Sequence, residues 1–297
     1  MRLFDKIRAM KNTSTKYLFF DVDGTLVNFK KQMPDSARRA LRTAQAEGHK
    51  LILCTGRSEA EVYPFLMDFG FDGYIFGSGS HVIAGDREIS THVFGPDRMA
   101  RVMDLLNRNN APLLIQMADV GILSPNALSA FRRYRLFQVA ETQSVYDVIT
   151  RAIGKVKVDV ARGRYADRYP DADMVVYTDA PFGIEAAADW LAPLGLRVTP
   201  SSLEPADTSA GEITRTDVDK GVALTEWMAD AGDGTDAAIA FGDGPNDLEM
   251  LEAAGTSVVM GNGVAEARER ADFVTADIDD DGIAKAMVRL GLIPSDF

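Results

Sequence analysis

The chain has 297 residues, a formal net charge of −12 at pH 7 and 46% hydrophobic residues. This length favours about two domains, and the composition is that of a globular protein rather than a disordered one. The single cysteine excludes an internal disulfide framework, and the acidic balance argues against nucleic acid or an anionic membrane as a partner. We find no apolar stretch typical of a membrane span or a secretory signal, so we expect a cytoplasmic protein.

Short apolar runs alternate with helical patterns along the chain, which predicts a mainly parallel sheet covered by helices. The first third carries predicted strands at residues 16–20, 50–54 and 74–76, with helical patterns over residues 35–47 and from residue 58 onward. The last third repeats this style, with a helix around Trp227, a strand at 237–241, a helix over 246–254 and a strand at 257–260.

The middle of the chain mixes both kinds of element. It has strand-like stretches at 113–116, 155–160 and 174–177, and helical ones at 98–108 and 182–191. We therefore expect a Rossmann-like, doubly wound α/β core formed by residues 1–84 and 208–297. A separate α/β domain, residues 85–207, would be inserted into this core.

The strongest local signal is the sequence DVDGTL at residues 21–26, directly after the first apolar strand. In open α/β sheets, ligands bind at the carboxyl ends of the strands, which is where Asp21 leaves its strand. A simple strand-to-turn aspartate would explain one carboxylate and a positive φ at Gly24. It would not explain carboxylates on both sides of Val22, so we expect Asp21 and Asp23 to belong to a ligand site.

Other strand ends supply compatible groups. Thr55 and Gly56 follow the second strand and offer a hydroxyl and backbone N–H groups suited to a phosphate. Asp243 and Asp247 follow the strand at 237–241. Asp247, or Asn246 before it, could equally serve as an N-cap of the next helix, whereas Asp243 at the strand end has no capping role.

Lys220 opens the helix that carries Trp227. A cation near a helix N-terminus opposes the helix dipole by roughly 0.3–1 kcal/mol. A solvated surface lysine is the ordinary interpretation of such a residue. An anion bound at that terminus would reverse the sign of the interaction.

Asp21, Asp23 and Asp243 would place three carboxylates at neighbouring strand ends. Like charges at this distance repel, so either their pKa values rise or a cation joins them. Oxygen ligands, without suitable histidines or cysteines, favour Mg²⁺ over zinc. A carboxylate nucleophile, a second carboxylate, a hydroxyl, a lysine and Mg²⁺ together are suited to phosphoryl transfer.

Four segments, at residues 21–25, 55–57, 220–221 and 242–247, resemble the four motifs of the haloacid dehalogenase superfamily. The motif order, the inserted domain and the sequence MGNG at 260–263 are similar to its Cof-type sugar-phosphatase branch. This resemblance implies that Asp21 attacks phosphorus and forms an aspartyl-phosphate. It also implies that Asp23 serves first as general acid and then as general base.

The resemblance further assigns binding roles. It implies that five residues contact the phosphoryl group, namely Gly24, Thr55, Gly56, Lys220 and Asn246. It implies a Mg²⁺ site made by the Asp21 carboxylate, the Asp23 carbonyl and Asp243, with Asp247 in or next to that site. In the inserted domain, Arg133 and Arg135 are weak candidates for substrate contact, since a solvated helical face explains them as well.

The expected function is hydrolysis of small phosphate monoesters such as sugar phosphates, flavin mononucleotide or pyridoxal phosphate. The inserted domain would act as a lid that excludes water and selects the leaving group. Two alternatives stay open at this stage. A phosphosugar mutase would return the phosphoryl group to a sugar, and a receiver-like module would hold it on an aspartate without turnover.

Overall fold

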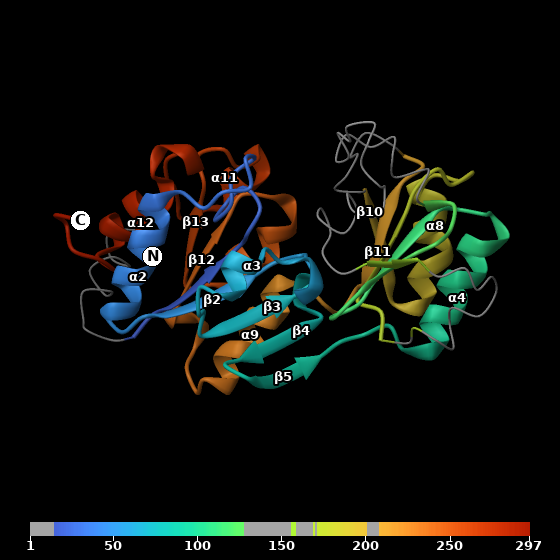
Figure 1. Cartoon of the computed structure of the whole chain (residues 1–297), viewed down its shortest axis with the longest axis horizontal. Coiled ribbons are helices and arrows are strands. Elements are labelled where there is room, and N and C mark those ends of the chain that lie inside the picture. Colours follow the sequence, from blue (N-terminus) through green and yellow to red (C-terminus); the bar gives the residue numbers. More distant parts are fainter. Residues whose placement is uncertain (1–14, 128–155, 159–168, 170, 201–207) are drawn as a thin grey trace. The chain divides into compact units, whose positions relative to one another are not determined.

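The structure is a computed structural model that describes residues 15–127, 156–158, 169, 171–200 and 208–297 (Figure 1). The chain divides into two compact units, each made of segments that are separate in the sequence. The first unit comprises Met1–Gly56, Gly70–Thr91 and Asp219–Phe297, and the second comprises Arg57–Phe69 and His92–Val218. Assignment of these units to a catalytic core and a lid stays a prediction.

An eight-stranded sheet forms the framework of the first unit, in the order β14-β13-β12-β1-β2-β3-β4-β5. Its strands are β1 (Tyr17–Phe20), β2 (Lys50–Cys54), β3 (Gly73–Phe76), β4 (His81–Ala84), β5 (Arg87–Thr91), β12 (Ala238–Gly242), β13 (Thr256–Val259) and β14 (Phe273–Val274). Pairing is parallel from β14 to β3, and β4 and β5 add antiparallel strands at one edge. The chain builds one side outward from β1 and later the other side from β12, which is the doubly wound order predicted from the sequence.

Helices cover both faces of this sheet. They are α2 (Asp35–Ala46), α9 (Lys220–Asp230), α10 (Leu248–Ala253), α11 (Ala265–Arg270) and α12 (Gly282–Leu290). Phe19 and Ile52 pack in one buried cluster with Leu224 and Trp227 of α9. The alternate strand residue Leu18 is equally buried. Burial of both residue sets explains why these strands read as continuous apolar runs.

Several details differ from the expectation. Residues 57–69 and 208–218, which we expected in the core, belong to the second unit. The β4–β5 hairpin pairs with β3, so the first sheet continues past the expected junction at residue 84 to Thr91. The helix expected from residue 58 is instead a 3₁₀ turn, Glu59–Glu61, followed by the short helix α3 (Pro64–Met67). Tyr63 is extended, with ψ 128°, because the residue before a proline is disfavoured in the helical region.

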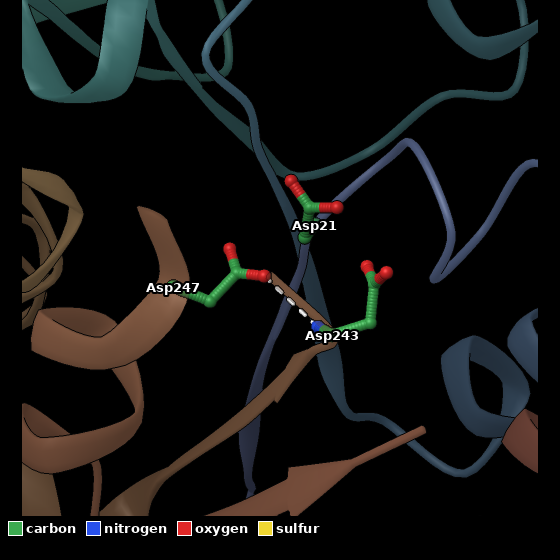
Figure 2. Close-up of side chains that lie close together, drawn as sticks. All are labelled: Asp21, Asp243 and Asp247. Carbon is green, nitrogen blue, oxygen red and sulfur yellow. Dashed lines mark hydrogen bonds between the residues drawn. The ribbon is translucent and has the colours of Figure 1, made fainter. Parts of the chain in front are cut away.

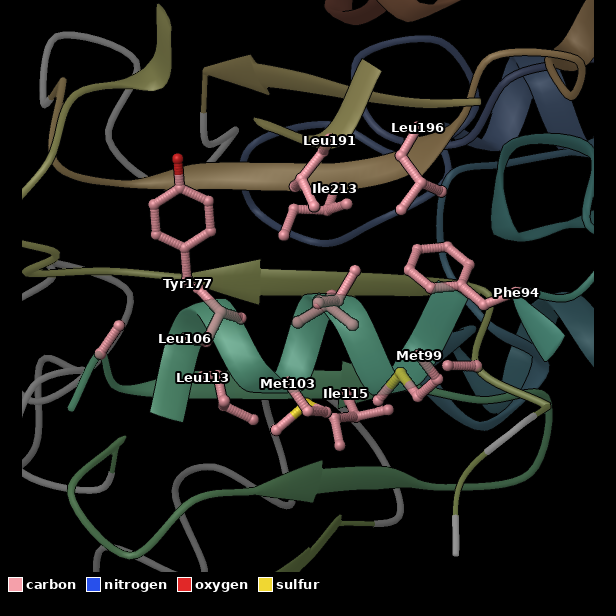
Figure 3. Packing of buried hydrophobic residues seen from close by; sticks show 14 of the residues in the cluster. Phe94, Met99, Met103, Leu106, Leu113, Ile115, Tyr177, Leu191, Leu196 and Ile213 are labelled. Carbon is pink, nitrogen blue, oxygen red and sulfur yellow. The ribbon is translucent and has the colours of Figure 1, made fainter. Parts of the chain in front are cut away.

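The second unit contains a six-stranded, mostly antiparallel sheet in the order β10-β11-β9-β6-β7-β8. Its strands are β6 (Leu113–Gln116), β7 (Gly121–Leu123), β8 (Val156–Val158), β9 (Met174–Tyr177), β10 (Leu196–Pro200) and β11 (Gly211–Arg215). The longer helices among its described residues are α4 (Gly95–Arg108) and α8 (Ile184–Leu191). In Figure 3, Met99, Met103 and Leu106 of α4 lie in one apolar cluster with Ile115 and Tyr177.

A buried acid also lies within the second unit. Glu61 Oε2 accepts hydrogen bonds from Gln116 Nε2 at 2.6 Å and from the Ser58 N–H at 3.2 Å. Burial raises the pKa of Glu61 from 4.5 to about 7, against the lowering effect of the hydrogen bond from Ser58. The folded protein therefore binds this proton more tightly than the unfolded chain does.

This pKa predicts a pH-dependent loss of stability. Because the folded-state pKa is raised, the stabilisation is fully present below about pH 4.5 and decreases as the pH rises through about 7. We expect the free energy of unfolding of the wild type to fall by about 1–3 kcal/mol between these pH limits. E61Q should remove this pH-dependent fall, since the amide has no proton to lose there but keeps the volume and one oxygen acceptor. Thermal unfolding at about pH 6 and about pH 8.5 measures it. The matched control is E59Q, an exposed residue of the same turn, and an equal effect of both variants would contradict the prediction.

Candidate active site

Strand order brings together carboxylates that are far apart in the sequence. Asp21 follows β1 and Asp243 follows the neighbouring strand β12, and the Asp21 N–H donates to the Phe241 carbonyl at 3.0 Å. Figure 2 shows Asp21, Asp243 and Asp247 converging at the ends of these strands. One carboxylate oxygen of each lies within 4.8 Å of the others. The predicted juxtaposition of Asp21 and Asp243 is therefore present in the structure.

Asp247 closes the loop that carries Asp243. Its Oδ2 accepts hydrogen bonds from the N–H groups of Asp243 and Gly244, both at 2.9 Å, the first of which is dashed in Figure 2. Asp247 occupies the N-cap position of α10, yet its side chain makes no capping hydrogen bond there. With 1% exposure, its carboxylate serves the loop and the site rather than the helix.

Lys220 is fully buried, which rules out a solvated surface lysine. Its Nζ lies 2.6 Å from Asp21 Oδ1 and 2.6 Å from Asp247 Oδ1, so one ammonium joins two of the three carboxylates. The preceding Asp219 caps α9 by accepting hydrogen bonds from the N–H groups of Gly221 and Val222. This cap offsets the unfavourable position of a cation in the first helical turn.

Burial and the mutual charges of the cluster shift the pKa values of its members. Burial, together with the charges of Asp247 and Asp243, raises the pKa of Asp21 well above its ordinary value, although Lys220 acts in the opposite direction. Burial and Asp247 also raise the pKa of Asp243 to about 6. Burial alone would lower the pKa of Lys220, but Asp21 and Asp247 raise it above its ordinary value. Three carboxylates facing one ammonium form an oxygen-only donor set that fits a hard divalent cation.

The turn after Asp21 fits tightly against Asp243. Gly24 has φ +92°, and a Cβ there would lie 2.2 Å from Asp243 Oδ2, so only glycine fits. Its N–H, which we expected to face a phosphate, donates instead to the Val27 carbonyl at 2.8 Å. Thr25 Oγ1 donates to Asp243 Oδ1 at 3.0 Å. Gly24 thus contributes space for the carboxylate, and its amide is occupied by the turn.

The two aspartates of DVDGTL have opposite environments. Asp21 is 5% exposed, whereas Asp23 is solvent-exposed. The charge of Asp23 still contributes to the raised pKa of Asp243, which places Asp23 near the cluster. A buried carboxylate beside a lysine suits a nucleophile. An accessible carboxylate at the rim suits proton exchange with a leaving group or water.

Candidate phosphate contacts also come together. Thr55 is buried at the end of β2, and a Cβ on Gly56 would lie 3.8 Å from Asn246 Nδ2. The same point lies 3.2 Å from Ser78 Oγ, a residue for which we expected no role. Ser78 has φ +55°, which is uncommon for a residue other than glycine. Such a conformation persists only where the surrounding structure holds it in place. The weak candidates Arg133 and Arg135 lie outside the described residues.

Comparisons with known proteins show the family of this chain. A family model described as haloacid dehalogenase-like hydrolase matches residues 18–287. The Bacillus subtilis protein YkrA is 27% identical over 94% of this chain and 99% of its own. The Escherichia coli pyridoxal phosphate phosphatase YbhA is 28% identical over 92% of this chain and 97% of its own. A solved haloacid dehalogenase subclass IIB sugar phosphatase, 25% identical, superposes with a TM-score of 0.71 over 94% of this chain and 100% of its own.

A doubly wound sheet with paired aspartates, a lysine and an acidic loop at its strand ends is suited to phosphoryl transfer. The chain belongs to the haloacid dehalogenase-like hydrolases, as a Cof-type phosphoric monoester hydrolase. The family and enzyme class predicted from its motifs are thus confirmed. Within the described residues, no helix combines the length and the apolar character needed to cross a bilayer.

Proposed function

We propose that this enzyme hydrolyses small phosphate monoesters through an aspartyl-phosphate on Asp21 and requires Mg²⁺. The observation that carries the proposal is the convergence of Asp21, Asp243 and Asp247 within 4.8 Å beside the buried Lys220. Mg²⁺ would be held by these three carboxylates and the Asp23 carbonyl. When bound, it would neutralise charge on the cluster and on the transferring phosphoryl group. Thr55, Gly56 and Lys220 would bind phosphoryl oxygens, with Asn246 at the rim.

In the first step, a carboxylate oxygen of Asp21 forms a bond to phosphorus while the bond from phosphorus to the ester oxygen breaks. Asp23, in its protonated form, transfers its proton to the departing alkoxide, which leaves as the alcohol. Lys220 is fixed between Asp21 and Asp247, so it faces the reacting centre without a reorganisation cost. Its charge stabilises the negative charge that moves with the phosphoryl group.

In the second step, Asp23, now ionised, takes a proton from a water molecule. The water oxygen bonds to phosphorus, and the bond between phosphorus and Asp21 breaks, which releases inorganic phosphate and restores the Asp21 carboxylate. Asp23 ends protonated, ready for the next ester. Its exposure gives it access to both the leaving alcohol and the entering water.

D23N should slow both steps. The amide keeps the volume but can neither donate the proton to the alkoxide nor take one from water, so we expect kcat to fall about 10²–10⁴-fold. The loss should be smaller for p-nitrophenyl phosphate in the first step, because its leaving group needs no protonation. Rapid-quench measurement of aspartyl-phosphate formation and decay checks this, and unchanged steady-state turnover would contradict the role of Asp23.

The pKa of Asp243, about 6, predicts how the cation affects stability. The metal-free folded protein binds this proton more tightly than the unfolded chain, so its stability decreases as the pH rises through about 6. Mg²⁺ competes with the proton and relieves the repulsion, so the Mg²⁺-induced rise in Tm should be larger at about pH 7.5 than at about pH 5.5. Scanning fluorimetry measures it.

In the metal-free state at about pH 7.5, D243N should unfold at a Tm about 2 °C or more above wild type, because one repelling charge is gone. It should show little response to Mg²⁺ and little activity. Zn²⁺ or Ca²⁺ in place of Mg²⁺ provides the comparison for ion specificity. An equal Mg²⁺ response of D243N and wild type would contradict the metal site.

For the substrate we propose sugar phosphates or related metabolites such as pyridoxal phosphate, with the second unit as the lid that selects the leaving group. The relatives that act on such compounds support this choice. The deciding experiment is a hydrolysis screen over phosphorylated metabolites with Mg²⁺, with D21N as blank. Release of inorganic phosphate supports a hydrolase, whereas an isomerised sugar phosphate indicates a mutase. A stable phosphoprotein without turnover indicates a receiver-like module.

A further inference from the structure

The turn at residues 260–264 connects β13 to α11, and the proposed chemistry does not use it. Asn262 in this turn bonds in two directions. Its Nδ2 donates to the Gly24 carbonyl at 2.8 Å, and its Oδ1 accepts from the Ile278 N–H at 3.0 Å. A carbonyl on one side and an N–H on the other leave only one orientation for the amide. The Gly24 carbonyl is therefore held from outside the loop to which it belongs.

That carbonyl belongs to the peptide between Gly24 and Thr25. Thr25 Oγ1 donates to Asp243 Oδ1 at 3.0 Å, and a Cβ on Gly24 would lie 2.2 Å from Asp243 Oδ2. A rotation of this peptide would move the Thr25 hydroxyl away from the carboxylate or push the loop against it. By holding one carbonyl, Asn262 thus determines how the loop after Asp21 meets Asp243.

The same turn also holds the main chain of Asp243. The Val264 N–H donates to the Asp243 carbonyl at 2.9 Å. A side chain at Gly263 would crowd this turn, because its Cβ would lie 2.7 Å from Val259 Cγ1 and 3.1 Å from the Asp243 carbonyl oxygen. One short turn therefore bonds to both segments that supply the proposed metal ligands.

We propose that Asn262 is a positioning residue for the metal site, which keeps Asp243 and the Asp21 loop at the spacing that the cation requires. This role rests on the proposed function, since it matters only if the site binds Mg²⁺. Removing groups that orient metal ligands costs about 10–100-fold in metal affinity or activity. We expect N262A to bind Mg²⁺ about 10–100-fold more weakly and to have a lower kcat. KM for the ester should change less than about twofold, because Thr55 and Lys220 keep their supports.

The matched control is N28A. Asn28 is also a nearly buried amide used at both ends, because its Nδ2 donates to Asp279 Oδ1 at 2.7 Å and its Oδ1 accepts from two N–H groups. It bonds neither to Gly24 nor to Asp243 through any described side-chain hydrogen bond. A merely structural amide would lose stability when truncated, as N28A should, without a change in Mg²⁺ affinity.

The test measures Mg²⁺ binding by isothermal titration of the full chain without substrate, followed by kcat and KM at saturating Mg²⁺. Weaker binding in N262A but not in N28A supports the role of Asn262. Should N262A fail to fold, N262S adds no charge, and its single short hydroxyl cannot bond to both the Gly24 carbonyl and the Ile278 N–H, so it should bind Mg²⁺ more weakly as well. Wild-type Mg²⁺ affinity in the folded Asn262 variant, or equally weakened Mg²⁺ binding in N28A, would overturn the positioning role of Asn262. Failure of the wild-type protein to bind Mg²⁺ would instead overturn the proposed function.

Discussion

D21N should lower kcat by about 10⁴-fold or more and still fold, because the amide preserves the volume but is not a nucleophile. The asparagine oxygen can keep the hydrogen bond from Lys220 that Asp21 Oδ1 now accepts at 2.6 Å. Since burial and the neighbouring carboxylates raise the pKa of Asp21, loss of its charge removes an unfavourable interaction. We therefore expect the metal-free variant to be at least as stable as wild type near pH 7.5.

Two measurements separate these effects. Phosphate release gives the loss of activity, and acid quenching with a labelled ester shows phosphorylated protein in wild type but not in D21N. The matched control is D72N, which removes a charge from a surface pair with Lys50 in the same unit and should leave kcat unchanged. Residual activity of D21N within tenfold of wild type would exclude Asp21 as the nucleophile.

Replacement of Lys220 should have the largest effect on stability. K220M leaves the Asp21 and Asp247 carboxylates buried without the ammonium that now lies 2.6 Å from each. Removing one partner from a buried ion pair costs about 3–5 kcal/mol, so we expect the free energy of unfolding to fall by about this amount. Loss of the charge that faces the phosphoryl group should also lower kcat/KM by about 10³-fold.

A double variant distinguishes the two roles of Lys220. K220M/D247N removes one positive and one negative charge, so it should recover much of the stability that K220M loses. It should not recover activity, because the cation at the reacting centre is still missing. Urea unfolding and steady-state kinetics of the four proteins complete the cycle. Wild-type stability and wild-type kcat/KM in K220M would contradict both roles assigned to Lys220.

Much of the architecture could be predicted because local patterns carried it. The apolar runs at residues 50–54 and 174–177 form strands, as predicted. Burial of a strand selects apolar residues in a run or in alternation, and both patterns can be recognised in the sequence. The motif at Asp21 and the loop at Asp243 were visible because their residue types and their positions after strands have a chemical meaning. Tyr63 shows where prediction from local patterns fails, because Pro64 after it prevents the helix that the apolar spacing predicted.

Residue type and position along the chain determined the fold class, since apolar runs and strand ends are local properties. The resemblance of four short motifs determined the family and the candidate nucleophile. Only the tertiary structure decided what surrounds those groups. It buried Lys220 between Asp21 and Asp247, engaged the Gly24 N–H in its own turn and bonded Asn262 to a carbonyl more than two hundred residues away. Burial, hydrogen-bond partners and pKa depend on segments that meet only when the sheet forms, which is why one strand's sequence does not contain them.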